Sequence, residues 1–422
     1  MKNKINYYNK DHFIENIIYI FCLILPVFLI AGSFLSELSI VIISLSFLTL
    51  SLKKKLYFYY NNVFSKVFLI FFLILIICSF FSVDQLTSLK KTLVYFRYWL
   101  FSLAIWYISQ SKKNFIRNLM YTFALCYSVL IIDGFYQYFV KVNLLGWPIV
   151  GTRVSSLFGD ELILGSYLSR ILPIFFATVI FSKDLKNNTI NYLFFLITFI
   201  SIEVLTFLSG ERIAFFYINL SAIFLIITMK NYKIFRSLSL AISLILILII
   251  SNISPAVSDR MIDKTINQLG LKNDDIKAFS NEHQNHFKSA LKMFDEHKVT
   301  GIGPRMFRYN CNKGEYKISF ESCSNHPHNN YIQILSEMGI IGFIFVICII
   351  FIFGFQISKY LFYKFFKNIY IFSDFQLALL SAILISIWPI APTGDFFNNW
   401  LSVIYFLPLG LFLNSLSKNR KK

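Results

Sequence analysis

Long apolar stretches separated by short polar segments recur along most of the chain. A helix needs about 20 mostly apolar residues to cross a membrane, and the pattern predicts twelve such spans. We expect them at 17–33, 38–52, 63–83, 92–110, 118–140, 162–182, 190–208, 213–229, 235–253, 330–357, 375–391 and 399–416. The sequence therefore predicts an all-α fold, a polytopic membrane helix bundle of about 12 transmembrane helices.

One long polar segment interrupts this pattern and divides the chain into three parts. Residues 1–253 hold the first nine predicted helices, 254–329 form a large loop, and 330–422 hold the last three helices. Within the loop, residues 280–297 predict an amphipathic helix on the membrane surface, ended by the GIGP turn at 301–304. Its apolar residues recur at helical spacing at Phe287, Ala290, Leu291 and Phe294.

The composition supports a membrane protein. Of the 422 residues, 56% are hydrophobic and 18% aromatic, and the mean hydropathy is +0.62. A water-soluble domain needs a more charged surface to cover its core, so that class is excluded. The net charge of +18 is explained by Lys and Arg in cytoplasmic loops, and we expect no nucleic-acid partner.

The basic residues of the short connections gather on one face of the predicted bundle. The positive-inside rule makes that face cytoplasmic, with both termini on it. Segments 141–161, 209–212 and 254–329 then lie outside. The polar start of the chain leads into Ile17–Ala31 without an A-x-A cleavage site, so we interpret it as a retained span. The basic residues are Lys53, Lys54, Lys55, Lys112, Lys113, Arg117, Lys183, Lys186, Lys230, Lys233, Arg236, Lys359, Lys364, Lys367, Lys418, Arg420, Lys421 and Lys422, with Lys90 and Lys91 as exceptions.

Two of the six cysteines lie in the polar outer loop, at Cys311 and Cys323. In an oxidising compartment such a pair favours a disulfide. Two free thiols, or a metal site with His326 and His328, are the alternatives. The other four cysteines lie in apolar spans, where cysteine behaves as a small hydrophobe.

Candidate chemistry concentrates on the outer face. The sequence has no Walker loop, no G-x-S-x-G, no H-E-x-x-H and no D-x-D metal motif. The absence of a nucleotide site argues against a nucleotide-sugar transferase and favours a donor already carried by the membrane.

Several outer residues suit an anionic donor. Arg212, in the turn before the eighth span, and Arg153, before the sixth, could bind a phosphate through two parallel N–H groups. Interfacial positioning, or a salt bridge from Arg212 to Glu211, would explain them without a ligand. Near the start of the tenth span, an imidazole of His326 or His328 could act as acid or base. A structural hydrogen bond is the alternative for His328. His283, His286, Lys288, Arg305 and Arg308 are expected along the polar margin of the loop helix, where a solvated face also explains each of them.

These residues lie in segments that resemble the O-antigen ligase and polymerase superfamily. The string HPHNNYIQILSEMGIIGF, with GIGP and FRYNC upstream, is similar to the signature segment of that family. The SGER turn at Arg212 and the segment RVSSLFGDELILGSYL resemble its other outer-face motifs. The resemblance covers about residues 150–345, whereas residues 1–140 match only in hydropathy.

The resemblance implies transfer of a glycan from undecaprenyl diphosphate to an acceptor at the periplasmic face of the bacterial inner membrane. A ligase uses lipid A–core as acceptor, and a polymerase uses another lipid-linked glycan. By this likeness His328 is the catalytic residue, with His326 and His286 supporting it. Arg212 binds the diphosphate, and a second arginine comes from the large loop. Our candidates are Arg308 and Arg305, with Arg153 as a further contact.

The implied reaction is metal-independent, uses no cofactor and inverts the anomeric centre. Glu211 departs from the smaller residue that is common before this arginine. The sequence does not distinguish a ligase from a polymerase.

A transporter, such as a lipid-linked oligosaccharide flippase or a small-anion permease, is the rival class. A transporter should carry polar groups near the middle of the membrane and repeated halves. The spans offer Asp133 and Glu203 but no repeat, and the titratable groups crowd one face. This asymmetry favours an enzyme.

The topology is tested with reporter fusions at Asn273 and Lys422. We expect phosphatase to be active at Asn273 and inactive at Lys422, with the opposite result for a fluorescent protein that matures only in the cytoplasm. Active phosphatase at Lys422 would overturn the orientation.

Overall fold

The computed structural model describes residues 2–183, 185, 188–268, 279–320, 322–389 and 391–419. Lys186 and the two fusion sites, Asn273 and Lys422, lie outside the described residues. Within these ranges every regular element is a helix and there is no β-strand, which confirms the predicted all-α class.

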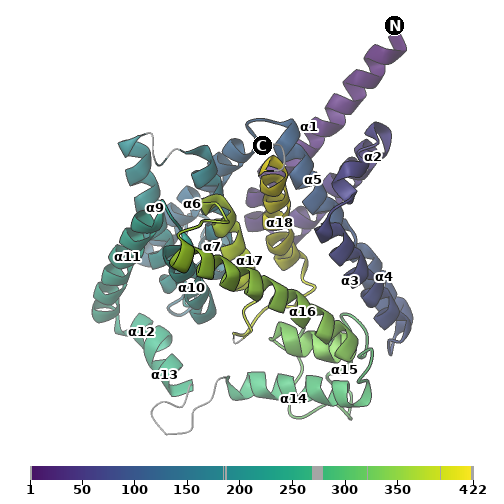
Figure 1. Cartoon of the computed structure of the whole chain (residues 1–422). Helices are drawn as coiled ribbons and strands as arrows, with labels where there is room; N and C mark the ends of the chain where they lie inside the picture. The colour runs from purple at the N-terminus through teal and green to yellow at the C-terminus, as the bar shows by residue number, and fades with distance from the viewer. Residues whose placement is uncertain are drawn as a thin grey trace.

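The helices form a bundle capped at one end by a layer of short helices (Figure 1). In the described ranges nine helices are long and apolar enough to cross a membrane. They are α1 (Lys2–Ala31), α2 (Ser33–Lys54), α3 (Val63–Phe80), α6 (Phe115–Val140), α7 (Leu164–Ser182), α9 (Thr189–Leu208), α11 (Lys233–Ile253), α16 (Asn330–Lys367) and α18 (Asn399–Asn419).

Three of the twelve predicted spans correspond to shorter helices, so the count of twelve is not confirmed. They are α5 (Arg97–Ser111), α10 (Arg212–Thr228) and α17 (Asp374–Ser386). The predicted span 92–110 is divided because α4 (Gln85–Tyr95) ends just before Arg97, which forms an ion pair with Glu37 of α2. The helix predicted at 375–391 ends at Ser386, and in the described part of the connection that follows, 387–389 and 391–398, Pro389 and Thr393 form hydrogen bonds with residues at the start of α16.

A break near the start of α16 ties the outer loop to the bundle. Gly339 has φ +62°, and the segment 298–303 packs into the gap. Ile302 N donates to Ser336 O (2.9 Å), Gly303 N to Glu337 O (3.0 Å) and Ile340 N to Lys298 O (2.9 Å). A side chain at Gly339 would meet the Val299 backbone, so this close approach requires glycine.

The acidic residues within the helices have internal partners. Asp133 of α6 accepts hydrogen bonds from Leu144 N (2.9 Å) and Ser156 Oγ (2.6 Å). Glu203 of α9 pairs with Arg236 of α11, and both side chains are buried. Buried charges that are paired in this way hold helices together, so these two acids do not support the transporter alternative.

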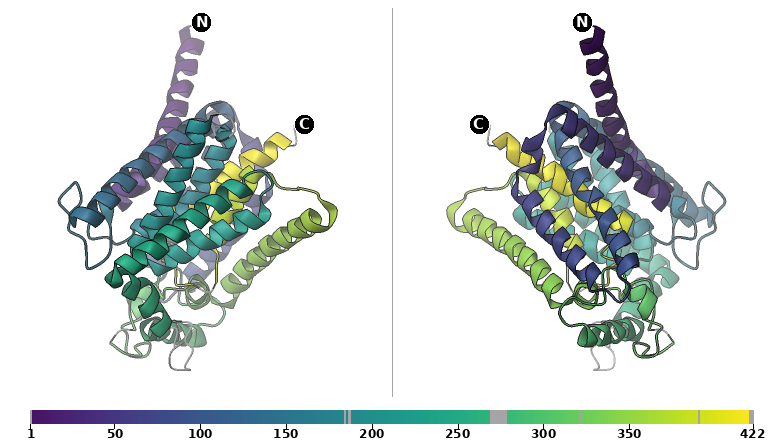
Figure 2. Two further views of the ribbon diagram at one scale, coloured as in Figure 1. Left: turned by 90° about the vertical axis from the view of Figure 1, so that its left-hand side faces the viewer. Right: turned by 90° about the vertical axis from the view of Figure 1, so that its right-hand side faces the viewer.

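The outer layer is built from the large loop. Its described elements are α12 (Pro255–Ser258), η3 (Asp259–Asp263), α13 (Lys264–Gln268), α14 (Asn281–Glu296) and α15 (Phe307–Asn310), and the short turns η1 (Tyr57–Tyr60) and η2 (Ser156–Phe158) lie in other connections. The described parts of α1 and α18 reach the opposite end of the bundle from this layer (Figure 2).

The predicted helix at 280–297 is present as α14, but its buried face differs from the predicted stripe. The buried residues are His286, Ser289, Ala290 and Met293, whereas Leu291 is exposed. The reason is that α14 packs on α16 and on a small core of the outer layer that includes Met306 and Cys311. In this core Cys311 and Cys323 are joined as a disulfide, with their Cα atoms 4.9 Å apart.

Candidate functional site

A cavity of about 470 Å³ lies between the 209–212 turn and the outer layer. Three arginines line it: Arg153 from the connection before α7, Arg212 from the start of α10, and Arg260 from η3. His283 of α14 lines the same cavity. We call it the arginine cavity, and its concentration of positive charge suits an anionic group.

Two of these arginines hold the turn in shape. Arg153 donates from Nε to Ser209 O (3.1 Å) and from Nη2 to Leu162 O (2.9 Å), and Arg260 donates from Nε to Gly210 O (3.1 Å). Gly210 has φ +68°, and a Cβ there would approach Arg260 Nε to 2.6 Å, so glycine is required. Arg153 is therefore a brace for the turn that presents Arg212.

Glu211, the unusual residue of the turn, forms hydrogen bonds with the start of α7. Its carboxylate accepts hydrogen bonds from Gly165 N (2.7 Å), Ser166 N (3.1 Å) and Ser166 Oγ (2.6 Å). Burial raises the pKa of this carboxyl, although these bonds oppose the change. Glu211 thus fixes the turn to the first residues of α7, where a negative charge complements the helix dipole.

Four histidines gather beside the arginine cavity, and we call them the histidine cluster. His283 and His286 come from α14, and His326 and His328 from the segment before α16. The ring centroid of His328 lies 4.1 Å from that of His326 and 5.2 Å from those of His283 and His286. The structure therefore brings together three residues that the sequence singled out for catalysis and support, His286, His326 and His328.

Thr393, in the 387–398 connection, holds both histidines of the segment. Its backbone N donates to His328 O (2.9 Å), and its carbonyl accepts from His326 Nε2 (3.0 Å). His328 has φ +58°, which turns its side chain back toward His326. The two residues flank Pro327, and with this left-handed backbone at His328 their rings lie together.

Burial makes the histidine cluster hard to protonate. It lowers the pKa of His328 to about 3, and the neighbouring His326, His283 and His286 act in the same direction. Burial also lowers the pKa of His283 and of His326. His328 is consequently neutral near pH 7, so a ring nitrogen can accept a hydrogen bond. In the part of the chain that is described, no group of three or more His, Cys, Asp or Glu side chains is arranged to hold a metal ion.

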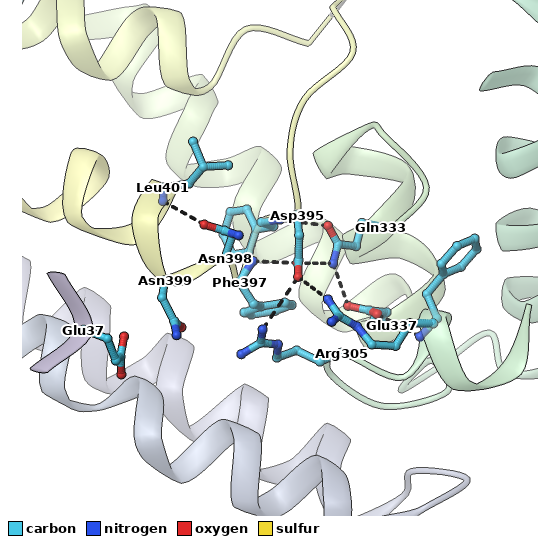
Figure 3. Close-up of polar contacts among 12 residues, drawn as sticks. Glu37, Arg305, Gln333, Glu337, Asp395, Phe397, Asn398, Asn399 and Leu401 are labelled. Carbon is cyan, nitrogen blue, oxygen red and sulfur yellow. Dashed lines mark hydrogen bonds and ion pairs between the residues drawn. The ribbon is translucent and has the colours of Figure 1, made fainter. Parts of the chain in front are cut away.

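The two loop arginines proposed for the donor lie against Asp395 (Figure 3). Arg308 Nη2 is 2.8 Å and Arg305 Nη2 is 3.9 Å from Asp395 Oδ2. The described lining of the arginine cavity includes neither of them. Instead, the charge of Arg308 acts on the pKa of His326, whereas the charge of Arg212 acts on the pKa of His283.

Residues 194–347 match the family model described as O-Antigen ligase. This part of the chain is similar to the O-antigen ligase family. The match confirms the predicted superfamily, and it covers Arg212, Arg260 and the histidine cluster. No curated protein matches the chain.

Around the O-antigen ligase segment, Arg260, Asp395 and Thr393 were not predicted from the sequence, and no specific role was predicted for His283. Asp395 could have been identified from the sequence, because a lone acid at the end of an apolar span is a candidate functional residue. Arg260 and Thr393 carry no local signal, since their importance comes only from contacts made across the fold.

We expect the folded protein to lose stability as the pH falls from 6.5 to about 3. The pKa of His328 is about 3 in the folded protein, below the ordinary 6.5, so protons bind the unfolded chain first and favour unfolding. The contribution of the neutral His328 to stability is complete above the ordinary histidine pKa of 6.5 and is lost progressively below it. Thermal unfolding of purified protein measures this change.

The matched variants for this test are His328→Asn and His297→Asn, the second at the end of α14. His328→Asn should show a smaller drop in unfolding temperature on acidification, and His297→Asn should behave like wild type. An equal drop in both variants would contradict the assignment.

Proposed function

We propose that this protein transfers a glycan from an undecaprenyl diphosphate-linked donor to an acceptor such as lipid A–core at the periplasmic face of the bacterial inner membrane. One observation carries the proposal: His283 lines the arginine cavity and also packs 5.2 Å, ring to ring, from His328. The arginine cavity, which suits an anionic leaving group, therefore lies next to the neutral imidazole of His328.

The donor diphosphate occupies the arginine cavity in this proposal. Arg212 is its main contact, and Arg260 takes the role of second arginine. Negative charge grows on the diphosphate as the glycosidic C–O bond breaks, and preorganised guanidinium groups stabilise that charge. Arg308 and Arg305 are less suited to this role, because both pair with the nearly buried carboxylate of Asp395 and neither is in the described lining of the arginine cavity.

His328 acts on the acceptor. Its unprotonated ring nitrogen accepts the proton of the acceptor hydroxyl as that oxygen attacks the anomeric carbon of the donor sugar. The new C–O bond forms while the bond to the diphosphate breaks, so one displacement inverts the anomeric centre. His326, fixed to Thr393 O, keeps the ring of His328 in position and does not itself transfer the proton.

A largely apolar cavity of about 270 Å³ begins next to this site and supports a lipid-linked substrate. Asn330 and Tyr331 lie at one end of its lining, and the rest comes mostly from apolar side chains of α3, α16, α17 and α18. We assign it to an isoprenoid or acyl chain of a substrate, because burial of apolar surface favours such a chain there.

Replacing Arg212 tests the donor site. We expect Arg212→Ala to lower transfer by about 10²-fold or more, as for loss of one transition-state donor. Arg212→Lys should also impair transfer, because it keeps the charge but loses the two parallel N–H groups. The measurement is transfer from a lipid-linked donor by purified protein.

The same assay with Arg260→Gln should show weaker use of the donor. Lys288→Gln is the control, since Lys288 is an exposed cation of the same outer layer. Full activity of Arg212→Ala at a normal protein level would refute the diphosphate role.

The histidines are distinguished by their separate variants. His328→Ala should reduce the rate by about 10²–10⁴-fold, the usual contribution of a general base. His326→Ala should reduce it less, because it removes only support. Both variants should still bind the lipid-linked donor.

A His328→Ala protein that transfers as fast as wild type would show that the base is misassigned. Inhibition of wild type by a chelator would contradict the metal-independent mechanism. In a deletion strain, loss of all capped lipid A–core supports the ligase reaction, whereas capping by single units supports a polymerase.

A further inference from the structure

A second polar cavity, of about 490 Å³, lies at the end of the bundle opposite to the candidate site. It lies where α7 and α10 end, α17 begins and α18 approaches its end. The other ends of these four helices point toward the outer layer. The positive-inside pattern assigns this cavity to the cytoplasmic face.

Asn414 of α18 gives this cavity an unsatisfied acceptor. Its side chain is 1% exposed and lines the cavity. Its Oδ1 atom has no hydrogen-bond partner within the described ranges. Buried polar atoms are ordinarily hydrogen-bonded, so a hydroxyl or N–H group of a bound molecule would complete this site.

Positive charge borders the same cavity. Lys230 lines it, with Nζ 4.7 Å from the ring centroid of Tyr370. The one carboxylate in the described lining, Asp374, accepts hydrogen bonds from the backbone N atoms of Lys230 and Asn231 (2.9 Å each). The Asp374 carboxylate therefore interacts with the 230–231 backbone, and Lys230 Nζ can attract an anion.

Apolar side chains lie at the edge of the cavity. Ile371 lines it and is 45% exposed, and Ile369 beside it is 48% exposed. Exposed apolar residues next to a polar cavity, at the end of membrane-spanning helices, are the environment of a lipid whose headgroup enters the protein.

We propose that this cavity binds the headgroup of an anionic phospholipid that carries free hydroxyl groups, of the phosphatidylglycerol class. Lys230 contacts the phosphate, a headgroup hydroxyl donates to Asn414 Oδ1, and the acyl chains lie along Ile369 and Ile371. A free polyol phosphate offers the same polar chemistry, but it gains nothing from the apolar edge. The site is independent of the proposed glycan transfer.

The test uses full-length protein in phosphatidylcholine nanodiscs that contain phosphatidylglycerol, phosphatidic acid or neither. Native mass spectrometry counts the retained lipid, and thermal unfolding gives the midpoint. Wild type should retain phosphatidylglycerol above phosphatidic acid, which lacks the headgroup hydroxyls, and unfold at a higher temperature with it. Lys230→Gln should lower retention of both anionic lipids about fivefold, as expected for one lysine at an anionic surface.

Asn414→Leu should abolish the preference for phosphatidylglycerol over phosphatidic acid. It should leave unchanged the retention of both anionic lipids that depends on Lys230. Lys113→Gln, an exposed lysine of another connection on the same predicted face, is the control. The proposal is overturned if Lys230→Gln retains as much lipid as Lys113→Gln, or if wild type shows no preference between the two anionic lipids. It also fails if free glycerol phosphate, added to phosphatidylcholine discs, reproduces the rise in midpoint. Lys230 is exposed, so its variant decides the test even if Asn414→Leu does not fold.

Discussion

The candidate site depends on one buried carboxylate, that of Asp395. It is 5% exposed, and a charge at that depth must be paired and hydrogen-bonded. Arg308 pairs with it at 2.8 Å, and Gln333 Nε2 donates to it at 2.7 Å. Gln333 also accepts from Phe396 N and donates to Glu337, which accepts from Phe307 N. These bonds fix the 387–398 connection and the large loop to α16, and Thr393 in that connection then places His326 and His328.

Burial has opposite consequences for the two kinds of basic side chain at this end of the bundle. A guanidinium keeps its charge even when it is partly buried, because its pKa is so high. An imidazole in the same surroundings loses its proton, and the close packing of four rings adds to that effect. The fold thereby sets a permanently charged region beside a region of neutral nitrogen acceptors.

Much of the fold follows from the local pattern of the sequence, and the site follows only in part. Apolar length predicted the helices, and the positions of Arg212 and His328 beside helix starts predicted that both lie at the membrane surface. The breaks before Arg97 and at Gly339 were missed because each depends on a partner distant in the chain, Glu37 for the first and Val299 for the second. The buried face of α14 was mispredicted for the same reason, since the surface that covers it belongs to the outer layer. Arg260 and Thr393 could be found only once the chain was folded.

The arginines around the site are not equivalent, and their acidic neighbours explain why. Arg308 and Arg305 face Asp395, so moving either toward a ligand would leave a buried charge with fewer partners, which is costly. Arg153 is held by two carbonyl groups and supports the turn at Gly210. The carboxylate of Glu211 interacts with the charge of Arg153 and accepts hydrogen bonds from the start of α7. Asp395 and Glu211 therefore anchor the backbone, whereas Arg212 and Arg260 line the cavity between the turn and the outer layer, together with Glu282.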